Sequence, residues 1–541
     1  MKEQRERERV AYDFAMKTSY RLGLCVTRMR HLALVASTAL IVTACGGGGG
    51  SASTVQPAPV APTYTDPVVY SSATNASLPS AQELSSVTRH QLTLGSSTLA
   101  YTATAGHLTA THLTSGVPQA SFFYVAYTLD NQNATTRPVT FFYNGGPGSA
   151  SVWLHLGSFG PKRLAAGAPS TATPTPFALV DNAETLLGIS DLVFVDAVGS
   201  GLSQAIAPNR NQTFWGVDVD AAVFRDFIRR YIAVNGRAAS PKFLFGESYG
   251  ATRSTVLANM LESAGITLSG VILQSSILDY NSNCAVLEPA VVSCGGFVPS
   301  YGATGAWYSL VTPNPLPVDL PMFLTDLRMF TSTQYEPAVA SYLTMATPPA
   351  PTLVTQLFNR TGVAESIWQT RFNLTPDVVQ RSLISGTLIG RYDARVAAPA
   401  GSALAAQGDP SSTFIVPSFS AAIASHLSNN LNYTNPSQYT LLSNAIQTWN
   451  FAHDGRALPD MIPDLAAAMT LNPRLKVLSL AGWHDLATPF HQTERDLARL
   501  GSNTNITIRN YNGGHMTYLD DASRVLQRSD LGAFYTSATT P

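Results

Sequence analysis

Charge is scarce in this chain, and neither sign prevails. Asp, Glu, Lys and Arg make up 12% of the 541 residues, and the formal net charge is −1. Proteins that bind nucleic acids carry an excess of Lys and Arg that neutralises phosphates. We therefore expect no nucleic acid as a partner. Hydrophobic residues, by contrast, reach 45%, which is ample for a large core.

Ligand spacings typical of metal sites are also absent from the sequence. There is no H-E-x-x-H, no paired C-x-x-C and no EF-hand loop, and the ten histidines are scattered. Because zinc sites need three or four such ligands close together, the sequence favours neither a metal nor another cofactor.

The apolar run over residues 32–44 is too short to cross a bilayer, which takes roughly 20 residues. Arg28 and Arg30 precede it, as basic residues precede the apolar part of an export signal. The run ends in Val42-Thr43-Ala44-Cys45. This resembles a bacterial lipobox, in which the cysteine becomes the lipidated first residue. An ordinary signal peptide with an incidental cysteine is the alternative.

Residues 1–45 are therefore interpreted as a signal region, followed by a linker over residues 46–80. Residues 1–28 are unlike the start of a signal, so Met29 is an alternative first residue. The linker begins with five glycines and continues with Ser, Thr, Pro and Ala, as flexible tethers do. Gly46 after the cysteine resembles lipoproteins sent to an outer membrane. We expect the protein on the periplasmic side of that membrane or on the cell surface, touching the membrane only through the lipid.

Only four cysteines are present, and two of them lie in the signal region. Cys25 would be removed with the signal, and Cys45 would be lipidated. Cys284 and Cys294 remain as an even pair in an exported domain, so we expect a disulfide between them.

The most specific motif is Gly246-Glu247-Ser248-Tyr249-Gly250, which lies between the apolar run 243–245 and a helical pattern over 251–264. G-x-S-x-G between a strand and a helix is typical of a nucleophile elbow, a sharp turn that holds the serine oxygen in a cleft. A Cβ at either glycine would collide with the neighbouring strand or helix. Ser248 is thus the candidate nucleophile.

A nucleophilic serine needs a base and an acid that orients the base. Hydrolases with such an elbow place the acid and then the histidine after it, each at the carboxyl end of a core strand. One strand pattern ends shortly before Asp485 and another before His515. The order Ser248, Asp485, His515 therefore predicts a catalytic triad. Alone, Asp485 could cap a turn and His515 could be a loop residue, and His484 is a weaker base candidate.

A glycine-rich loop, Asn144-Gly145-Gly146-Pro147-Gly148, follows the strand pattern 139–143. A phosphate-binding loop is one interpretation, but no Gly-Lys-Ser/Thr follows, and Pro147 lacks a backbone donor. We favour an oxyanion hole formed by the backbone N–H groups of Gly146 and Tyr249.

With these motifs in place, the sequence resembles the serine carboxypeptidase family. Four segments carry the resemblance in the family's order: residues 144–148 (N-G-G-P-G), 196–203 (D-A-V-G-S-G-L-S, with Ala197 where the family has Pro), 246–249 (G-E-S-Y) and 514–516 (G-H-M). The resemblance implies the triad and oxyanion hole named above. It also implies that Asn144 and Glu247 bind the terminal carboxylate of a peptide substrate.

A terminal carboxylate would be repelled by an ionised Glu247, whereas a protonated Glu247 could donate a hydrogen bond to it. In the family a second Glu shares that proton, but Ser158 stands at the matching position here. Ser149 likewise replaces a cysteine that forms a disulfide in some relatives. The paired-acid device is therefore incomplete, and strict carboxypeptidase specificity is an open question.

The expected fold is an α/β-hydrolase, with a mainly parallel sheet flanked by helices and a mostly helical cap. The core would comprise residues 81–280 and 441–541, and the cap would be inserted over 281–440. The charges of residues 390–395 within it could reach the cleft or pair with one another, and we favour the pairing. We expect strands over 139–143, 191–195, 270–273, 475–480 and 506–509, and helices over 223–234 and from Pro376 after an N-cap at Thr375.

Three functions are compatible with these patterns. The leading one is an exported serine-type carboxypeptidase that cleaves C-terminal residues of peptides through an acyl-enzyme. An esterase or acyltransferase that uses the same triad without a terminal-carboxylate requirement is favoured by Ser158. The third is a surface binding protein with a decayed active site. The complete set of triad, glycine loop and elbow argues against it, because a decayed site should have lost at least one of them.

Overall fold

The computed structural model describes residues 64–540 except 168–174, 288–290 and 313–318. The predicted signal region, the lipidation at Cys45 and the first part of the linker over 46–80 lie outside the described residues. Of the helices in the described part, none combines the length and the hydropathy needed to cross a membrane.

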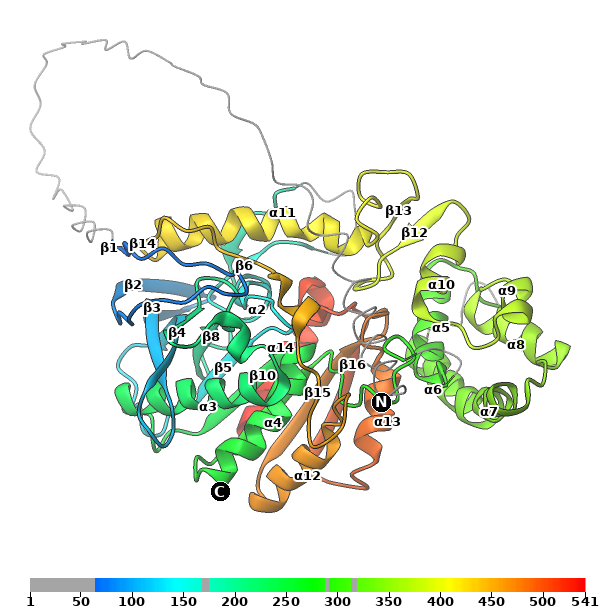
Figure 1. The fold of residues 1–541 in the computed structure, drawn as a ribbon. Coiled ribbons are helices and arrows are strands. Elements are labelled where there is room, and N and C mark those ends of the chain that lie inside the picture. Colours follow the sequence, from blue (N-terminus) through cyan, green and yellow to red (C-terminus); the bar gives the residue numbers. More distant parts are fainter. Residues whose placement is uncertain (1–63, 168–174, 288–290, 313–318, 541) are drawn as a thin grey trace, which may run out of the picture.

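A ten-stranded sheet runs through the centre of the molecule (Figure 1). Its strand order is β16-β15-β11-β10-β5-β8-β4-β3-β2, with β9 (Gln204–Ala205) paired to β4. Six neighbouring strands are parallel: β5 (Val139–Tyr143), β8 (Asp191–Val195), β10 (Lys242–Glu247), β11 (Gly270–Gln274), β15 (Lys476–Gly482) and β16 (Ile506–Tyr511). The other end of the sheet is antiparallel: β2 (Ser85–Leu94), β3 (Ser97–Thr111) and β4 (Pro118–Leu129).

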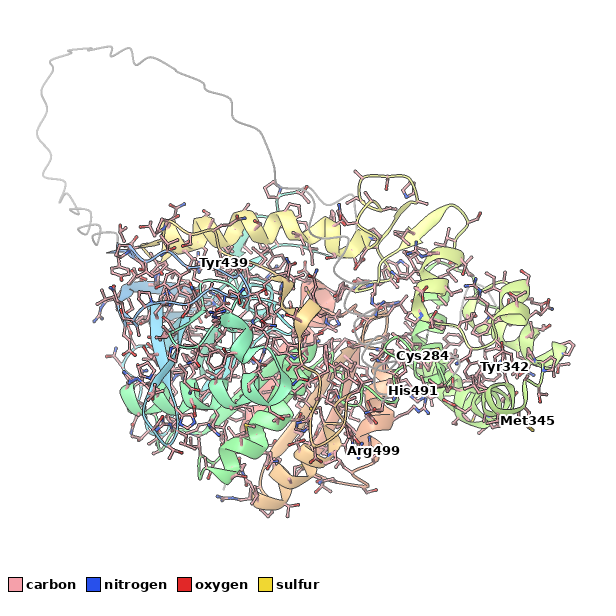
Figure 2. All side chains as sticks on the ribbon, in the orientation of Figure 1. Cys284, Tyr342, Met345, Tyr439, His491 and Arg499 are labelled. Carbon is pink, nitrogen blue, oxygen red and sulfur yellow. A yellow bond between two sulfur atoms is a disulfide. The ribbon has the colours of Figure 1, made fainter. Side chains whose placement is uncertain are left out.

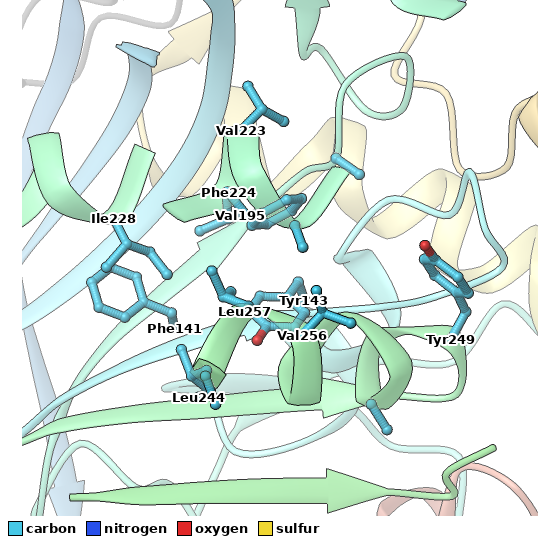
Figure 3. Packing of buried hydrophobic residues seen from close by; sticks show 14 of the residues in the cluster. Phe141, Tyr143, Val195, Val223, Phe224, Ile228, Leu244, Tyr249, Val256 and Leu257 are labelled. Atoms are coloured by element: carbon cyan, nitrogen blue, oxygen red, sulfur yellow. The ribbon is translucent and has the colours of Figure 1, made fainter. Parts of the chain in front are cut away.

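The central strands are apolar along their whole length because both faces of the sheet are covered. Every residue of β5, β8, β10 and β11 is buried, as expected for parallel strands between two helical layers. One face packs against α3 (Val217–Val234), α4 (Tyr249–Ser263) and α12 (Ile462–Leu471). Figure 3 shows Phe224 and Ile228 of α3 and Leu257 of α4 over Phe141 and Leu244 of the sheet.

The opposite face packs against α2 (Val152–Gly157), α11 (Pro410–Ser425) and α14 (Asp521–Thr539). Trp153 of α2 contacts Phe419 of α11, with ring centroids 4.8 Å apart. Three short strand pairs lie outside the main sheet: β1 (Tyr64–Thr65) with β14 (Tyr433–Thr434), β6 (Lys162–Leu164) with β7 (Leu179–Asp181), and β12 (Thr387–Ile389) with β13 (Ala397–Pro399).

A cluster of helices with its own apolar core lies beside the sheet (Figure 1). It contains α5 (Val298–Trp307), α6 (Leu320–Phe330), α7 (Glu336–Met345), α8 (Pro351–Thr361), α9 (Glu365–Thr370) and α10 (Pro376–Ser382). Helix α10 begins at Pro376 as predicted, although the Thr375 side chain makes no capping hydrogen bond. A disulfide joins Cys284 to Cys294 within this core. Figure 2 shows Tyr342 and Met345 at the outer end of the cluster, far from Tyr439.

The parallel strands end at one edge of the sheet, and the predicted site residues follow those ends. The glycine-rich loop 144–148 follows β5, and Ser248 follows β10. Asp485 comes after β15, before α13 (Phe490–Ala498), and His515 comes after β16. In open α/β sheets this edge is where ligands bind.

Candidate active site

Ser248 occupies a sharp turn between β10 and α4. Its backbone angles, φ 61° and ψ −126°, are rare for a residue with a side chain. The two glycines of the motif make the turn possible. A Cβ on Gly246 would lie 2.1 Å from the Gly250 carbonyl oxygen, and one on Gly250 would lie 2.7 Å from the Tyr143 carbonyl oxygen. The packing of strand and helix therefore requires glycine at both positions.

Asp485 and His515 form a buried pair. The Nδ1–H group of His515 donates to Oδ2 of Asp485 over 2.7 Å, and the exposed fractions of the two residues are 2% and 0%. Oδ1 of Asp485 accepts the backbone N–H groups of Ala487 and Thr488 at 2.7 and 3.0 Å. Because both carboxylate oxygens are occupied, the acid is fixed in orientation, and Nε2 of His515 is left to act as a base.

Three residues that no sequence motif singles out hold this pair in place. The Thr488 hydroxyl oxygen lies 2.7 Å from Oδ2 of Asp485. The backbone N–H of His515 donates to the Tyr392 carbonyl at 2.6 Å, and the Ser275 hydroxyl donates to the His515 carbonyl at 2.5 Å. The Tyr392 ring also meets the imidazole edge to face at 5.1 Å. These contacts fix both the position and the plane of the imidazole.

The protonation of His515 depends on two opposing effects. Burial lowers the pKa of His515, but the Asp485 carboxylate raises it, and the resulting pKa lies above its usual value. His515 is therefore protonated at acidic pH and becomes a free base only as the pH rises.

Ser248 and His515 line the same cavity, which has a volume of about 420 Å³. Among the described residues no hydrogen bond joins the two side chains. In ligand-free active sites such bonds are often long and tighten only when substrate binds.

The cavity walls come from distant parts of the chain. Helix α11 contributes one face, and the segment 438–446 contributes another, including Tyr439. Tyr392 and Met516 lie near the histidine. Of the described lining residues, Glu247 is the only one with an acidic side chain, and none is Lys or Arg.

Glu247 is buried next to the candidate nucleophile and is held by two donors. Asn144 Nδ2 donates to its Oε1 at 2.9 Å, and the Tyr518 hydroxyl donates to its Oε2 at 2.6 Å. Asn144 is oriented in turn, because its Oδ1 accepts the Leu154 N–H at 3.1 Å. Burial raises the pKa of Glu247 to about 7, although His515 and the two hydrogen bonds act in the opposite direction.

Ser158 does not take part in this arrangement. It is fully buried at the end of α2, and its hydroxyl donates to the Leu154 carbonyl one turn earlier in the helix, 2.5 Å away. Tyr518, which lies in the short 3₁₀ turn Thr517–Leu519, contacts Glu247 instead. No motif in the sequence points to Tyr518, because its role depends on how this turn folds back toward β10.

The glycine-rich loop lies against the elbow. A Cβ on Gly145 would be only 2.4 Å from the Tyr249 backbone nitrogen, so the two segments are in direct contact. Gly146 has φ +101°, a conformation that favours glycine, and it lines the cavity. Tyr249 is the first residue of α4, where a backbone N–H has no acceptor within the helix. The structure thus brings together the loop and the N–H predicted to form the oxyanion hole.

Two other groups noted in the sequence have structural partners. His484 is buried outside the cavity lining, with Nε2 2.8 Å from Asn512 Oδ1, and burial lowers its pKa to about 4. Arg395 of the charged stretch pairs with Asp393 at 2.8 Å and Asp520 at 3.0 Å.

Among the described residues, no group of three or more Cys, His, Asp or Glu side chains could hold a metal ion.

Comparison with known proteins indicates which class of enzyme has a site of this kind. The family model of the serine carboxypeptidases matches residues 96–296, which include three of the four motif segments. No curated protein sequence matches the chain. Among solved structures, the prohormone-processing carboxypeptidase Kex1(delta)p of Saccharomyces cerevisiae aligns with a TM-score of 0.51 and 14% identity, covering 80% of this chain and 91% of that one.

More distant similarities include a proline iminopeptidase of Mycobacterium smegmatis and a thermostable carboxyl esterase of Bacillus coagulans. Their TM-scores are 0.35 and 0.34, with 14% and 12% identity. They cover 83% and 81% of this chain, and 100% and 99% of their own.

The fold is that of an α/β-hydrolase, and the protein is a serine hydrolase. The resemblance to serine carboxypeptidases predicted from the motifs is confirmed over residues 96–296.

Proposed function

We propose that the protein is a serine carboxypeptidase-like hydrolase that removes C-terminal residues from peptides. The observation that carries this proposal is the position of Glu247 and Asn144. They are hydrogen-bonded to each other and line the same cavity as Ser248 and His515. A cavity that presents a buried carboxyl and an amide beside a nucleophile suits a substrate that ends in a carboxylate.

In the proposed reaction, Nε2 of His515 takes the proton of Ser248 as the serine oxygen attacks the scissile carbonyl. The N–H groups of Gly146 and Tyr249 stabilise the negative oxygen of the tetrahedral intermediate. The imidazolium then protonates the leaving amine, and an acyl-enzyme remains. Water, deprotonated by His515, attacks the acyl-enzyme and releases the shortened peptide.

The substrate carboxylate would be bound by the Asn144 amide and by Glu247 in its protonated form. Since the pKa of Glu247 is raised to about 7, the acid keeps its proton at acidic pH and loses it as the pH rises through neutrality. An ionised Glu247 would repel the carboxylate. Peptides with a free C-terminus should therefore bind best below neutral pH.

The rest of the cavity favours residues with uncharged side chains. Helix α11 presents Ser412, Ile415, Val416 and Ser420 to the cavity. The absence of Lys, Arg and Asp from its described lining means that a charged substrate side chain would lose water without gaining a partner. We include neutral, largely apolar C-terminal residues in the proposed substrate class.

An esterase or acyltransferase is the second candidate, and the serine at position 158 is the observation that favours it. Without a second acid, terminal-carboxylate binding could be weak enough for esters to compete. Hydrolysis of a blocked dipeptide, its C-terminal amide and a simple ester, each measured across pH, separates the two functions. Preference for the free acid supports the carboxypeptidase, whereas equal or faster turnover of the ester at every pH supports the alternative.

Export with a lipid anchor at Cys45 is also proposed, supported by the apolar run 32–44 and the lipobox-like end. Palmitate labelling and the mass of the mature protein test it. A labelled product that begins at Cys45 is expected. An unlabelled product that begins elsewhere would rule out the anchor.

A further inference from the structure

Tyr518 donates a hydrogen bond to Glu247 but does not line the substrate cavity. Its hydroxyl donates to Oε2 at 2.6 Å, its side chain is fully buried, and it is absent from the cavity lining. Asn144, which donates to the other oxygen, does line the cavity. Oε1 of Glu247 is thus bonded to a residue that lines the cavity, and Oε2 is bonded to one that does not.

Within the part of the chain that the structure describes, no second acid is hydrogen-bonded to Glu247. Among the described side chains its hydrogen-bond partners are Asn144 and Tyr518. Ser158, at the position where a second Glu would be expected, is bonded to Leu154 instead. Beyond these bonds, the titratable groups that act on Glu247 are His515, which lowers its pKa, and Asp485, which raises it. Glu247 in turn raises the pKa of Tyr392.

A tyrosine in this position acts differently from an acid. Burial and the neighbouring Glu247 raise the pKa of Tyr518 well above its usual value, so the phenol remains a donor at every working pH. A strong donor prefers the carbonyl oxygen of a protonated carboxyl group, because the hydroxyl oxygen of that group is a poor acceptor. Asn144 also donates to Oε1, but over 2.9 Å, whereas the Tyr518 bond to Oε2 is 2.6 Å. The stronger bond makes Oε2 the carbonyl oxygen and places the acidic proton on Oε1, and the Asn144 amide then turns to the substrate carboxylate when it binds.

We propose that Tyr518 is a positioning residue that replaces the second acid: by donating to Oε2 it directs the proton of Glu247 to Oε1, where a substrate carboxylate can accept it. This inference rests on the proposed function. It deepens that function by making carboxylate recognition depend on one titrating acid held by a neutral donor, not on a pair that shares a proton.

The Tyr518→Phe variant tests the inference because it removes one oxygen and retains the ring. The lost hydrogen bond stabilises the ionised form of Glu247 more than the protonated form, so its removal raises the pKa of Glu247. For each variant the ratio of kcat/KM for a blocked dipeptide to that for its C-terminal amide is measured from pH 4 to 9. The amide has no carboxylate and serves as the reference. We expect the pH at which this ratio falls by half to move upward by about one unit.

Tyr511→Phe is the matched control. The Tyr511 hydroxyl also donates to a carboxylate, Asp530 Oδ2 at 2.8 Å, but Tyr511 is absent from the cavity lining. In this control the midpoint, the pH at which the ratio of kcat/KM for acid and amide falls by half, should equal that of the unmodified protein. An unchanged midpoint in Tyr518→Phe, or an equal shift in both variants, would overturn the inference.

A double substitution tests whether Glu247 is the group whose titration sets the pH dependence of the ratio. Glu247→Gln cannot titrate, so adding Tyr518→Phe to it should leave the ratio independent of pH. A midpoint that persists in Glu247→Gln and still moves with Tyr518→Phe would show that another group titrates, and would refute the inference. If the unmodified protein gives the same pH profile for acid and amide, the carboxylate role of Glu247 fails, and with it the proposed function. If the unmodified protein separates the two substrates but Tyr518→Phe moves nothing, only the inference fails.

Discussion

Oδ2 of Asp485 accepts a hydrogen bond from Nδ1 of His515 over 2.7 Å, at the carboxyl ends of two adjacent parallel strands. The pair is buried, and Thr488 supplies both a backbone N–H and a nearby hydroxyl to the carboxylate. This arrangement fixes which imidazole nitrogen carries the proton.

Asp485→Asn should therefore disable hydrolysis without unfolding the protein. An amide at this position can stabilise the wrong tautomer of His515 and gives no charge to balance an imidazolium. We expect kcat for an ester substrate to fall by about 10³- to 10⁴-fold, with little change in KM. Asp393→Asn, which alters an ion pair to Arg395 and leaves the Asp485–His515 pair intact, is the control. A loss of less than tenfold in Asp485→Asn would contradict the assigned role.

Glu247→Gln should discriminate between substrates. The amide can no longer offer a carboxyl proton, so binding of a terminal carboxylate weakens. We expect kcat/KM for the free-acid peptide to fall at least about tenfold more than kcat/KM for an ester. Steady-state kinetics at pH 5 on both substrates give the comparison. Equal losses on the two would remove Glu247 from carboxylate recognition.

The pH profiles of the two substrate types should differ at the alkaline end. The raised pKa of His515 means that activity on any substrate is lost as the pH falls, because the base becomes protonated. The pKa of Glu247, raised to about 7, means that activity on free-acid peptides is also lost as the pH rises. We expect a bell-shaped kcat/KM for the free acid and a profile for the ester that stays high above pH 7. Coinciding profiles would contradict this assignment.

Gly145→Ala should damage both the fold and the reaction. The new Cβ would lie 2.4 Å from the Tyr249 nitrogen, so the loop and the elbow must separate. We expect a loss of about 1–3 kcal/mol in the free energy of unfolding and a fall in kcat of at least about 100-fold. Gly188→Ala is the matched control, since a Cβ there has no atom within 4 Å. Denaturant unfolding and ester kinetics are measured on both variants. An unchanged kcat in Gly145→Ala would argue against an oxyanion hole formed by this loop.

Much of the sheet could be predicted because its signals are local. The strands at 139–143 and 191–195 have the predicted bounds, since apolar runs between turn residues specify buried parallel strands. The helix predicted over 223–234 begins earlier, at Val217. Its first turns contain Asp218 and the buried Asp220, which interrupt the apolar pattern. The Asp220 carboxylate can be buried because it forms an ion pair with Arg253 at 2.7 Å, a contact that the local sequence does not reveal.

The parts of the site that could not be predicted depend on distant contacts. Tyr518 reaches Glu247 across 271 residues of sequence, and Tyr392 holds His515 through a backbone carbonyl, which carries no sequence signal. Helix α11 is a similar case. Its sequence mixes apolar residues with Ser and Thr, without a distinct apolar face, and contains Pro417, so the face that meets the cavity is decided by packing against α2.

The most direct test of the proposed function is the ratio of kcat/KM for a blocked dipeptide with a free C-terminus to that for its C-terminal amide at pH 5, using the unmodified protein. With Glu247 protonated and paired to Asn144, we expect the free acid to be preferred by at least about tenfold. A ratio of one or below would contradict terminal-carboxylate recognition at this site.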